Sequence, residues 1–221
     1  MKVEAETISA AARRRSVHPK PLIAVTGGNA ERAESAALEF AAAGVVGLVS
    51  YGIAGGLDPD LIPGDVLVAD KVLLPDGDRI STHGTWRRAL AAALNAAPAM
   101  EGAICGCDLV VATAAQKASL YAETGARAVD MESHGVARAA RARVLPFLVV
   151  RAICDPANGA VPSAAVAGLG KAGERRPFSV IGELLRHPEQ LPQLIRLARG
   201  SNTALRRLAS TTPSILKLVE N

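Results

Sequence analysis

Residues 45–56 read VVGLVSYGIAGG, an apolar run that ends in the glycines Gly52, Gly55 and Gly56. A short apolar run predicts a buried strand over residues 45–50, and the glycines predict a turn directly after it. Because glycine has no side chain, such a turn lets a ligand approach the backbone N–H groups. Strand-to-helix turns also need glycine for their own geometry, and the spacing matches neither the dinucleotide fingerprint nor the phosphate loop. The run therefore predicts a strand and a turn, and it leaves ligand binding open.

The segments on either side of this run alternate between strand and helix patterns. Residues 22–26 form an apolar run before a Gly-Gly-Asn turn, and residues 31–43 are rich in Ala and Glu and stop at Gly44, as helices often do. Further strands are predicted at residues 65–72, 103–105, 128–130 and 146–153, and further helices at 85–96, 114–124 and 132–142. This alternation predicts an α/β fold with a largely parallel sheet and helices on both faces.

The last third of the chain has a different character. Beyond Pro162, four short helical patterns at residues 178–186, 191–199, 203–209 and 213–219 are separated by proline or glycine. A chain of 221 residues is long enough for one large domain with its own core. We therefore expect a single domain over residues 1–221, with an α/β core at 1–162 and a helical tail at 163–221.

Composition and charge exclude several classes of protein. The chain is 49% hydrophobic but only 3% aromatic, and its formal charge of +4 comes from basic residues that are not interleaved with aromatics. We therefore expect no nucleic-acid partner. No apolar run reaches the roughly 18 residues of a membrane span. The three cysteines are too few and too poorly spaced for a zinc site, so we expect no metal, no disulfide framework and a cytoplasmic protein.

Two acidic residues follow predicted strands and could carry chemistry. Residues 129–133 read VDMES, which places Glu132 at the start of a helix with Met131 beside it. A carboxylate can accept hydrogen bonds from both hydroxyls of a ribose, and a methionine offers the sugar an apolar contact. An acidic residue in a first helical turn also complements the helix dipole without binding anything.

The second acidic residue lies in residues 151–156, which read RAICDP. Here an apolar strand delivers Asp155 to the carboxyl edge of the sheet, where open α/β folds bind ligands. If Asp155 is protonated near neutral pH, through burial or a neighbouring acid, it can donate a proton to a purine nitrogen. Asp followed by Pro is also what a helix N-cap and first helical position look like.

Taken together, these stretches resemble the purine nucleoside phosphorylase and methylthioadenosine nucleosidase superfamily. The matching stretches are SYGIAGGL at 50–57 with PGD at 63–65, AVDME at 128–132, and VRAICD at 150–155, and they follow one another in family order. Within it the sequence is most similar to the hopanoid-associated phosphorylases, through DMESH at 130–134, RAICDP at 151–156 and RHPEQLP at 186–192. The resemblance implies a three-layer sandwich with a mostly parallel, mixed sheet.

The resemblance also implies a reaction, the cleavage of the N-glycosidic bond of an adenosine-type nucleoside through an oxocarbenium-like transition state. Asp155 matches the general acid that protonates the purine N7, and Glu132 matches the residue that binds the ribose 2′ and 3′ hydroxyls. Met131 would pack on the ribose, and Val110 and Val111 stand where family members hold the purine. No cofactor or metal is implied.

The nucleophile is phosphate in the phosphorylases and a carboxylate-activated water in the nucleosidases. The candidates for phosphate binding are Gly28, Arg32, Arg151 and the turn residues Ile53, Ala54 and Gly55, although Ile53 stands where many relatives place a serine. Glu4 and Glu6 are the candidates for activating water, and they also suit a solvated acidic segment. The alternatives to a phosphorylase are a water-dependent nucleosidase of 5′-thioadenosine-type nucleosides and a nucleoside-binding module without turnover.

The partner expected from the resemblance is a small-molecule nucleoside, and for the hopanoid-associated subfamily it is lipid-linked adenosylhopane. Members of the superfamily pair their subunits, so a homo-oligomer is expected. The tail residues Leu191, Leu194, Ile195 and Leu197, with Arg196 and Arg199 nearby, suit peripheral contact with the inner face of the membrane. They also suit core packing with a solvated basic face.

Overall fold

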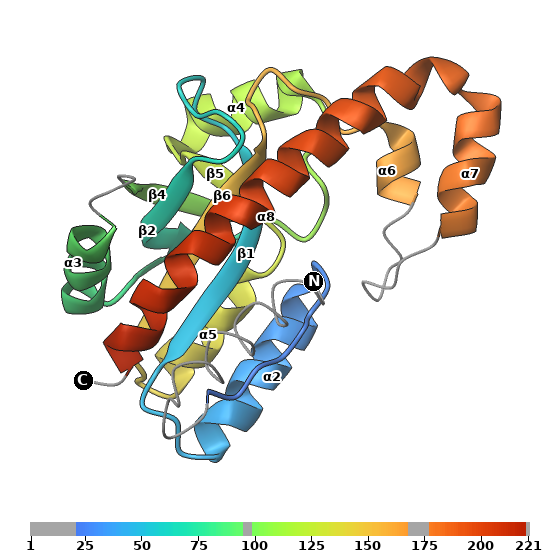
Figure 1. Cartoon of the computed structure of the whole chain (residues 1–221). Helices are drawn as coiled ribbons and strands as arrows, with labels where there is room; N and C mark the ends of the chain where they lie inside the picture. The colour runs from blue at the N-terminus through green and yellow to red at the C-terminus, as the bar shows by residue number, and fades with distance from the viewer. Residues whose placement is uncertain (1–20, 95–98, 168–176, 220–221) are drawn as a thin grey trace.

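The computed structural model describes residues 21–94, 99–167 and 177–219, in which helices surround a central sheet of six strands (Figure 1). The strand order is β3-β2-β4-β5-β1-β6, and β2 also pairs with β6, so the sheet closes on itself. The elements in chain order are α2 (Ala30–Ala42), β1 (Leu48–Gly56), β2 (Val66–Leu73), β3 (Arg79–Ser81), α3 (Gly84–Ala93), β4 (Met100–Gly106), α4 (Ala114–Thr124), β5 (Ala128–Asp130), α5 (Ser133–Ala142), β6 (Phe147–Asp155), α6 (Ser163–Ala167), α7 (Pro177–Arg186), the 3₁₀ turn η1 (Pro188–Gln190) and α8 (Leu191–Val219).

The sheet is mixed, and its longest ladders are parallel. Strand β1 runs parallel to β6 from the Leu48 and Phe147 pair to the Gly55 and Asp155 pair, and β4 runs parallel to both β2 and β5. The antiparallel pairs, β1 with β5, β2 with β3 and β2 with β6, are only two or three residues long. The predicted α/β class with a mostly parallel, mixed sheet is therefore confirmed.

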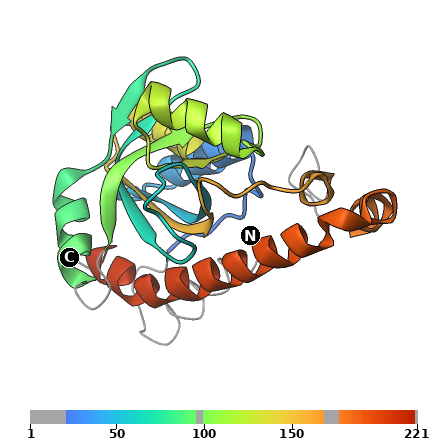
Figure 2. The same cartoon turned by 90° about the horizontal axis from the view of Figure 1, so that it is seen from above.

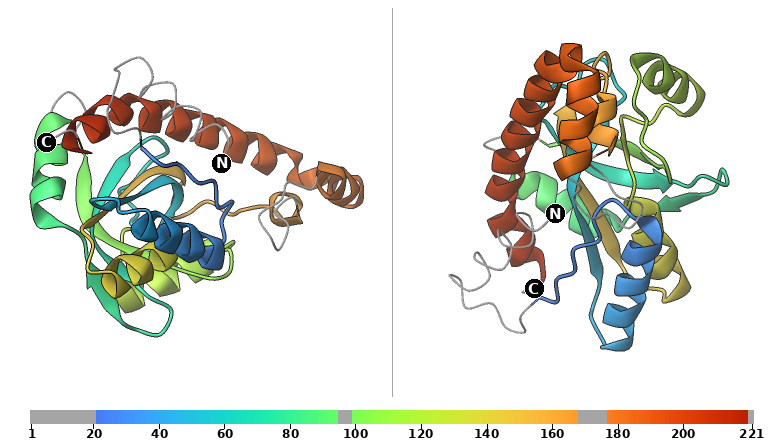
Figure 3. Two further views of the ribbon diagram at one scale, coloured as in Figure 1. Left: turned by 90° about the horizontal axis from the view of Figure 1, so that it is seen from below. Right: turned by 90° about the vertical axis from the view of Figure 1, so that its right-hand side faces the viewer.

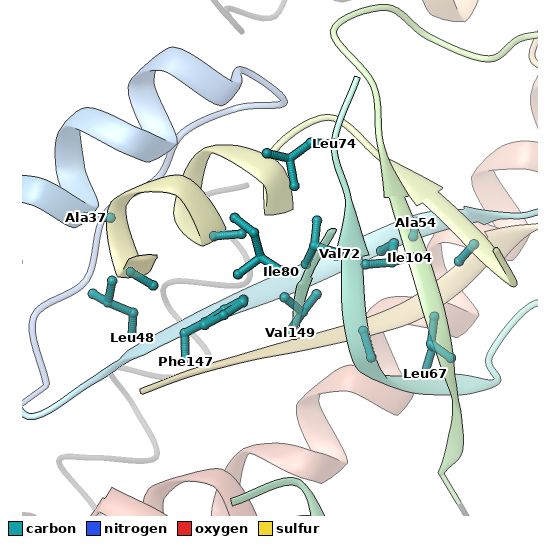
Figure 4. Packing of buried hydrophobic residues seen from close by; sticks show 14 of the residues in the cluster. Ala37, Leu48, Ala54, Leu67, Val72, Leu74, Ile80, Ile104, Phe147 and Val149 are labelled. Atoms are coloured by element: carbon teal, nitrogen blue, oxygen red, sulfur yellow. The ribbon is translucent and has the colours of Figure 1, made fainter. Parts of the chain in front are cut away.

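Helices form layers on both faces of this sheet. Figure 4 shows Leu48, Ile80 and Phe147 gathered between the strands and the pair α2 and α5, where they belong to the main apolar core. On the other face, α8 and α3 cover a second cluster that contains Leu90, Val150 and Leu208. Figure 2 shows α8 running along that side of the sheet. A helix layer, a sheet and a second helix layer make up the predicted three-layer sandwich.

One strand and one turn predicted in the N-terminal half of the chain were wrong. Residues 21–27 form no strand, and Leu22 and Val25 are 51% and 40% exposed rather than buried. This segment and the first residues of β1 both line an apolar cavity, and the segment is not among the strands that pair with β1. Residues 52–56 form no turn, because β1 continues to Gly56 and pairs there with β5 and β6. The glycines are therefore strand residues, and at Gly56 the missing side chain allows close approach, since a Cβ there would lie 3.1 Å from the backbone oxygen of Asp155.

The other predicted core elements are confirmed within a few residues at each end, with α4 and β5 placed as predicted. Strand β3 and helix α6 were not predicted. Strand β3 is only three residues long, and α6 only five, which gives too few residues for a periodic pattern to appear. Both lie outside the elements that carry the candidate site residues.

The tail differs from its prediction, because three of the four predicted short helices are one helix. Helix α8 continues through Gly200 and Pro213. Its buried residues Ala204, Leu208 and Ile215 pack on the sheet, and this burial outweighs the poor helix propensity of glycine and proline. Figure 3 shows α6 and α7 packed together near the N-terminal end of α8, away from the sheet. Among the described residues, no helix is both long and apolar enough to cross a bilayer.

Gly200 and Gly182 make a matched pair of helical glycines. A Cβ on Gly200 would lie 2.1 Å from the carbonyl oxygen of Cys154, whereas a Cβ on Gly182 would meet nothing within 4 Å. We expect Gly200→Ala to lower the free energy of unfolding by about 1–3 kcal/mol, since β6 backbone must move to admit the methyl group. Gly182→Ala should leave it unchanged or raise it slightly. Urea denaturation of both variants would check this, and equal effects would contradict the close helix-to-strand packing.

Candidate active site

Glu132 lies in the junction between β5 and α5, and its carboxylate does not cap the helix. It occupies the N-cap position of α5, yet its side chain makes no capping hydrogen bond. Its Oε1 instead accepts from the hydroxyl of Thr26 at 2.5 Å and from the N–H of Gly28 at 2.7 Å. The side chain is 23% exposed. The helix-start interpretation of Glu132 therefore does not account for its orientation, and the Oε2 oxygen stays available to a ligand.

Arg151 is a buried cation that orders the residues around Glu132. Its Nε donates to Oδ2 of Asp130 at 2.6 Å and its Nη2 donates to Ser50 at 2.7 Å, while Glu132 Oε2 lies 3.8 Å from Nη2. The N–H and hydroxyl of Ser133 donate to Asp130 as well. Because a buried charge is tolerated only when it is paired and hydrogen-bonded, this network fixes the start of α5. Arg151, a candidate for anion binding, is thus engaged by carboxylates of its own chain.

Asp155 ends β6 and is almost enclosed. Its side chain is 10% exposed, its Oδ1 accepts from the thiol of Cys154 at 2.9 Å, and its Oδ2 forms an ion pair with Lys117. Burial, together with the negative charge of Asp155, raises the pKa of the Cys154 thiol, so this thiol remains a proton donor. A Cβ on Gly55 would be in ordinary contact with both Asp155 oxygens at 3.5 Å, whereas a Cβ on Gly56 would lie only 3.1 Å from the backbone oxygen of Asp155. Asp155 is thus not an N-cap of the kind its Asp-Pro sequence suggests.

Lys117 is the functional candidate that the sequence interpretation missed. It lies in the first turns of α4, its side chain is completely buried, and its Nζ also donates to the carbonyl oxygen of Pro156 at 2.9 Å. A signal was present, because helical spacing puts Lys117 on the same face as Leu120 and Tyr121, which pack against the core. A lysine on the apolar face of a helix needs an anionic partner, and here the partner is Asp155.

The strand register explains how residues far apart in sequence come to one place. Gly55 in β1 pairs with Val129 of β5 on one side and with Asp155 of β6 on the other. Glu132 follows β5 directly, so both carboxylates come from strands that flank the glycine-rich end of β1. The structure also brings Gly28 to Glu132 and Gly55 to Asp155.

The predicted purine-binding residues lie in the loop between β4 and α4. Val110 and Val111 are partly buried, and Val111 packs against the cluster that contains Leu57 and Val129. Asp108 at the start of this loop bonds to Nε2 of the fully buried His134 at 2.9 Å. The loop is thereby tied to α5, the helix that Glu132 precedes.

Of the predicted nucleophile-binding residues, Gly28 and Arg151 both lie at Glu132, whereas the others are not gathered there. The side chains of Ile53 and Ala54 lie on opposite faces of β1, with Ile53 packed toward α8 and Ala54 in the main core. Arg32 lies on the exposed face of α2. Glu4 and Glu6 lie outside the described residues. Within the described ranges, no three His, Cys, Asp or Glu side chains are grouped in a way that could hold a metal ion.

A cavity of about 530 Å³ lies beside Glu132. Its walls are the segment 21–26, the inner face of α2, residues 43–51 leading into β1, and the end of α8. Leu22, Phe40, Val136 and Ile215 are among the apolar side chains that line it, and Glu132 is the one acidic residue among its described lining residues. The cavity therefore brings a largely apolar volume next to the carboxylate of Glu132.

Comparison with known proteins identifies the family. The phosphorylase superfamily matches residues 16–186 of the chain. Curated 5′-methylthioadenosine/S-adenosylhomocysteine nucleosidases from several strains of Staphylococcus aureus are 30% identical over 144 residues, which is 57% of this chain and 63% of theirs. The chain thus spans less than two thirds of the length of these relatives.

Solved structures show the same fold at lower identity. The 5′-methylthioadenosine/S-adenosylhomocysteine nucleosidase of Neisseria meningitidis, in complex with methylthio-immucillin-A, superposes with a TM-score of 0.70 at 19% identity, covering 98% of this chain and 95% of that one. The corresponding Helicobacter pylori enzyme gives 0.67 at 22% identity over 96% and 94%. The futalosine hydrolase of H. pylori gives 0.62 at 20% identity over 83% and 75%.

Proposed function

Because the chain belongs to the phosphorylase superfamily, we propose that it cleaves the N-glycosidic bond of an adenosine-type nucleoside with Asp155 and Glu132. The observation that carries this proposal is that the carboxylates of Asp155 and Glu132, which differ in burial and in hydrogen-bond partners, both lie near the glycine-rich end of β1. Asp155 is nearly buried between a thiol and an ammonium group, whereas Glu132 is partly exposed with one oxygen held by Thr26 and Gly28. Two carboxyl groups in such different environments are suited to different roles in one reaction, such as proton donation and substrate binding.

The two tasks follow from the charge that develops in the reaction. As the bond breaks, the purine gains negative charge and the ribose becomes oxocarbenium-like. Asp155, enclosed and supplied with proton donors, neutralises the departing purine at N7. Glu132 accepts hydrogen bonds from the 2′ and 3′ hydroxyls through Oε2 and stabilises the positive sugar, with Met131 on the apolar side of the ribose. Val110 and Val111 form the wall against the base.

We propose adenosylhopane as the substrate, with a large apolar group at the 5′ position. The apolar cavity beside Glu132 supports this, since a ribose held at Glu132 would lie at the cavity wall. A 5′-thioadenosine-type nucleoside is the second candidate, supported by the names of the S. aureus relatives. The nucleophile differs with the candidate, being phosphate in a phosphorylase and water in a nucleosidase.

One experiment separates these candidates. Adenine release is followed from adenosylhopane and from 5′-methylthioadenosine, each with and without phosphate, and the sugar product is identified. Release from adenosylhopane that requires phosphate and yields a sugar 1-phosphate is the expected result. Phosphate-independent release from the thioadenosine supports the second candidate. Binding of a nucleoside without any release indicates a binding module and overturns the enzymatic proposal.

We also propose that a homo-oligomer of the protein contacts anionic membranes through the tail. Leu185, Leu191 and Ile195 are 80%, 49% and 44% exposed, and α8 carries five basic and no acidic residues over its length. Because the second half of α8 is core, truncation would unfold the protein, and substitutions are the better test. Leu185→Ser with Ile195→Ser should reduce sedimentation with phosphatidylglycerol vesicles. Ile62→Ser, at a 62% exposed isoleucine outside the tail, should not, and equal sedimentation of all variants would remove the proposal.

A further inference from the structure

Lys117, the ion-pair partner of Asp155, is a buried charged residue of the candidate site that has no step of its own in the proposed reaction. Lys117 has no exposed side-chain surface, and its ammonium group is bonded to Asp155 Oδ2 and to the carbonyl oxygen of Pro156. Lysine is rarely enclosed to this degree, because removing an ammonium from water is costly. A hydrophobic residue would fill the same place without that cost. Packing alone therefore does not explain why a charged lysine occupies this buried position.

The surroundings of the pair are simple. On β6, the Cys154 thiol donates to Asp155 Oδ1 at 2.9 Å; on β1, Gly55 presents no side chain; and on α4, Lys117 itself supplies the charge. In the part of the chain that the structure describes, the hydrogen bonds and ion pairs of the two side chains involve only each other, Cys154 and Pro156. Asp155 thus has two proton donors, of which only the ammonium group is a cation.

We propose that Lys117 is a positioning residue that holds the proton which Asp155 passes to the departing base. This inference rests on the proposed function. As the C1′–N9 bond breaks, its electron pair moves to the purine, Asp155 gives a proton to N7, and the ammonium of Lys117 gives a proton to Asp155 Oδ2. Asp155 ends as a carboxylate and Lys117 as a neutral amine, which regains its proton from water after the base has left.

Burial makes this transfer physically reasonable. A low-dielectric setting disfavours charged groups, which brings the neutral pair of amine and carboxylic acid closer in free energy to the ion pair. A lysine also keeps its proton to a far higher pH than a carboxyl does, by roughly six pH units for the free side chains. The ammonium group of Lys117, bonded to Asp155 Oδ2, is therefore a proton source that a lone carboxylate lacks.

The pH dependence of kcat/KM tests the proposal. Lys117→Met keeps the length of the side chain and removes the charge. It should lower kcat/KM at least about tenfold at neutral pH and shift the alkaline limb at least about one pH unit lower. The matched control is Lys71→Met, which breaks a lysine–aspartate contact of 3.9 Å with a 41% exposed lysine and should keep the wild-type profile. A uniform loss at every pH, with the alkaline limb in place, would show a structural role only and overturn the proposal.

Two further variants keep the test decisive. Lys117→Arg preserves the positive charge, but arginine holds its proton too tightly to transfer it. The activity of this variant should therefore be low, and wild-type activity would overturn the proposal.

A double variant replaces Lys117→Met if that single variant does not fold. It carries Lys117→Met together with Asp155→Asn, which leaves no unpaired charge, and its rate is compared with that of Asp155→Asn alone. Equal rates within about twofold are expected for residues that act as one unit. A further tenfold loss would contradict the proposal. Absence of adenine release from the wild-type protein would refute the proposed function itself.

Discussion

Asp155→Asn is expected to reduce the rate of adenine release by about 10²–10⁴-fold while the nucleoside still binds. An asparagine has the shape of aspartate and can still accept from Lys117, but its amide does not give a proton to the purine. The base must then leave as an anion, and the barrier rises. Single-turnover rates and the dissociation constant of a nucleoside would be measured with both proteins. Loss of rate with retained affinity is the signature of a group that acts in the transition state.

Asp58 provides the control for this substitution. It forms an ion pair of 2.7 Å with Arg127, and its side chain is 10% exposed, the same as that of Asp155. Asp58→Asn therefore removes a carboxylate of equal burial and similar pairing outside the proposed reaction. Its rate should stay near that of the wild type. If both variants lose the same activity, the loss reflects weakened packing at this end of the sheet, and Asp155 is not the acid.

The sequence was sufficient for the order of the core elements because each leaves a local signal. Helix α4, for example, begins with the capping box of Thr113 and Gln116 and ends at Gly125 in the left-handed conformation. Such signals depend on neighbouring residues alone. The glycines of β1 were misread for the opposite reason. A Cβ on Gly56 would lie 3.1 Å from the backbone oxygen of Asp155, a hundred residues later, and local sequence holds no record of that contact.

The same distinction applies to the candidate site. Glu132 and Asp155 were found because each follows an apolar strand, a position that sequence shows directly. Their partners were harder to predict, since Lys117 meets Asp155 only after α4 has packed against the sheet. The long helix α8 was predicted as three pieces because Gly200 and Pro213 are unfavourable locally, while the burial that outweighs them is tertiary.

The second large effect is expected for Glu132→Gln acting on ribosides. Oε1 already accepts from Thr26 and Gly28, so these two donors should hold the oxygen of a glutamine in the same place. The amide NH₂ then takes the position of Oε2 and presents donors to the ribose hydroxyls, which need an acceptor. Each hydrogen bond to a charged acceptor contributes about 1.5–3 kcal/mol, so losing two should lower kcat/KM about 10²–10⁴-fold.

A comparison of substrates isolates this effect from a general loss of structure. With a 2′,3′-dideoxynucleoside there are no hydroxyls to bind, so Glu132→Gln and the wild type should differ much less than they do with the riboside. The control variant is Glu101→Gln, at a 46% exposed carboxylate bonded to Arg87, which should leave both substrates unaffected. If Glu132→Gln lowers kcat/KM equally for both substrates, the carboxylate serves mainly to hold Thr26 and Gly28 in place. The ribose hydroxyls would then be bound by other residues.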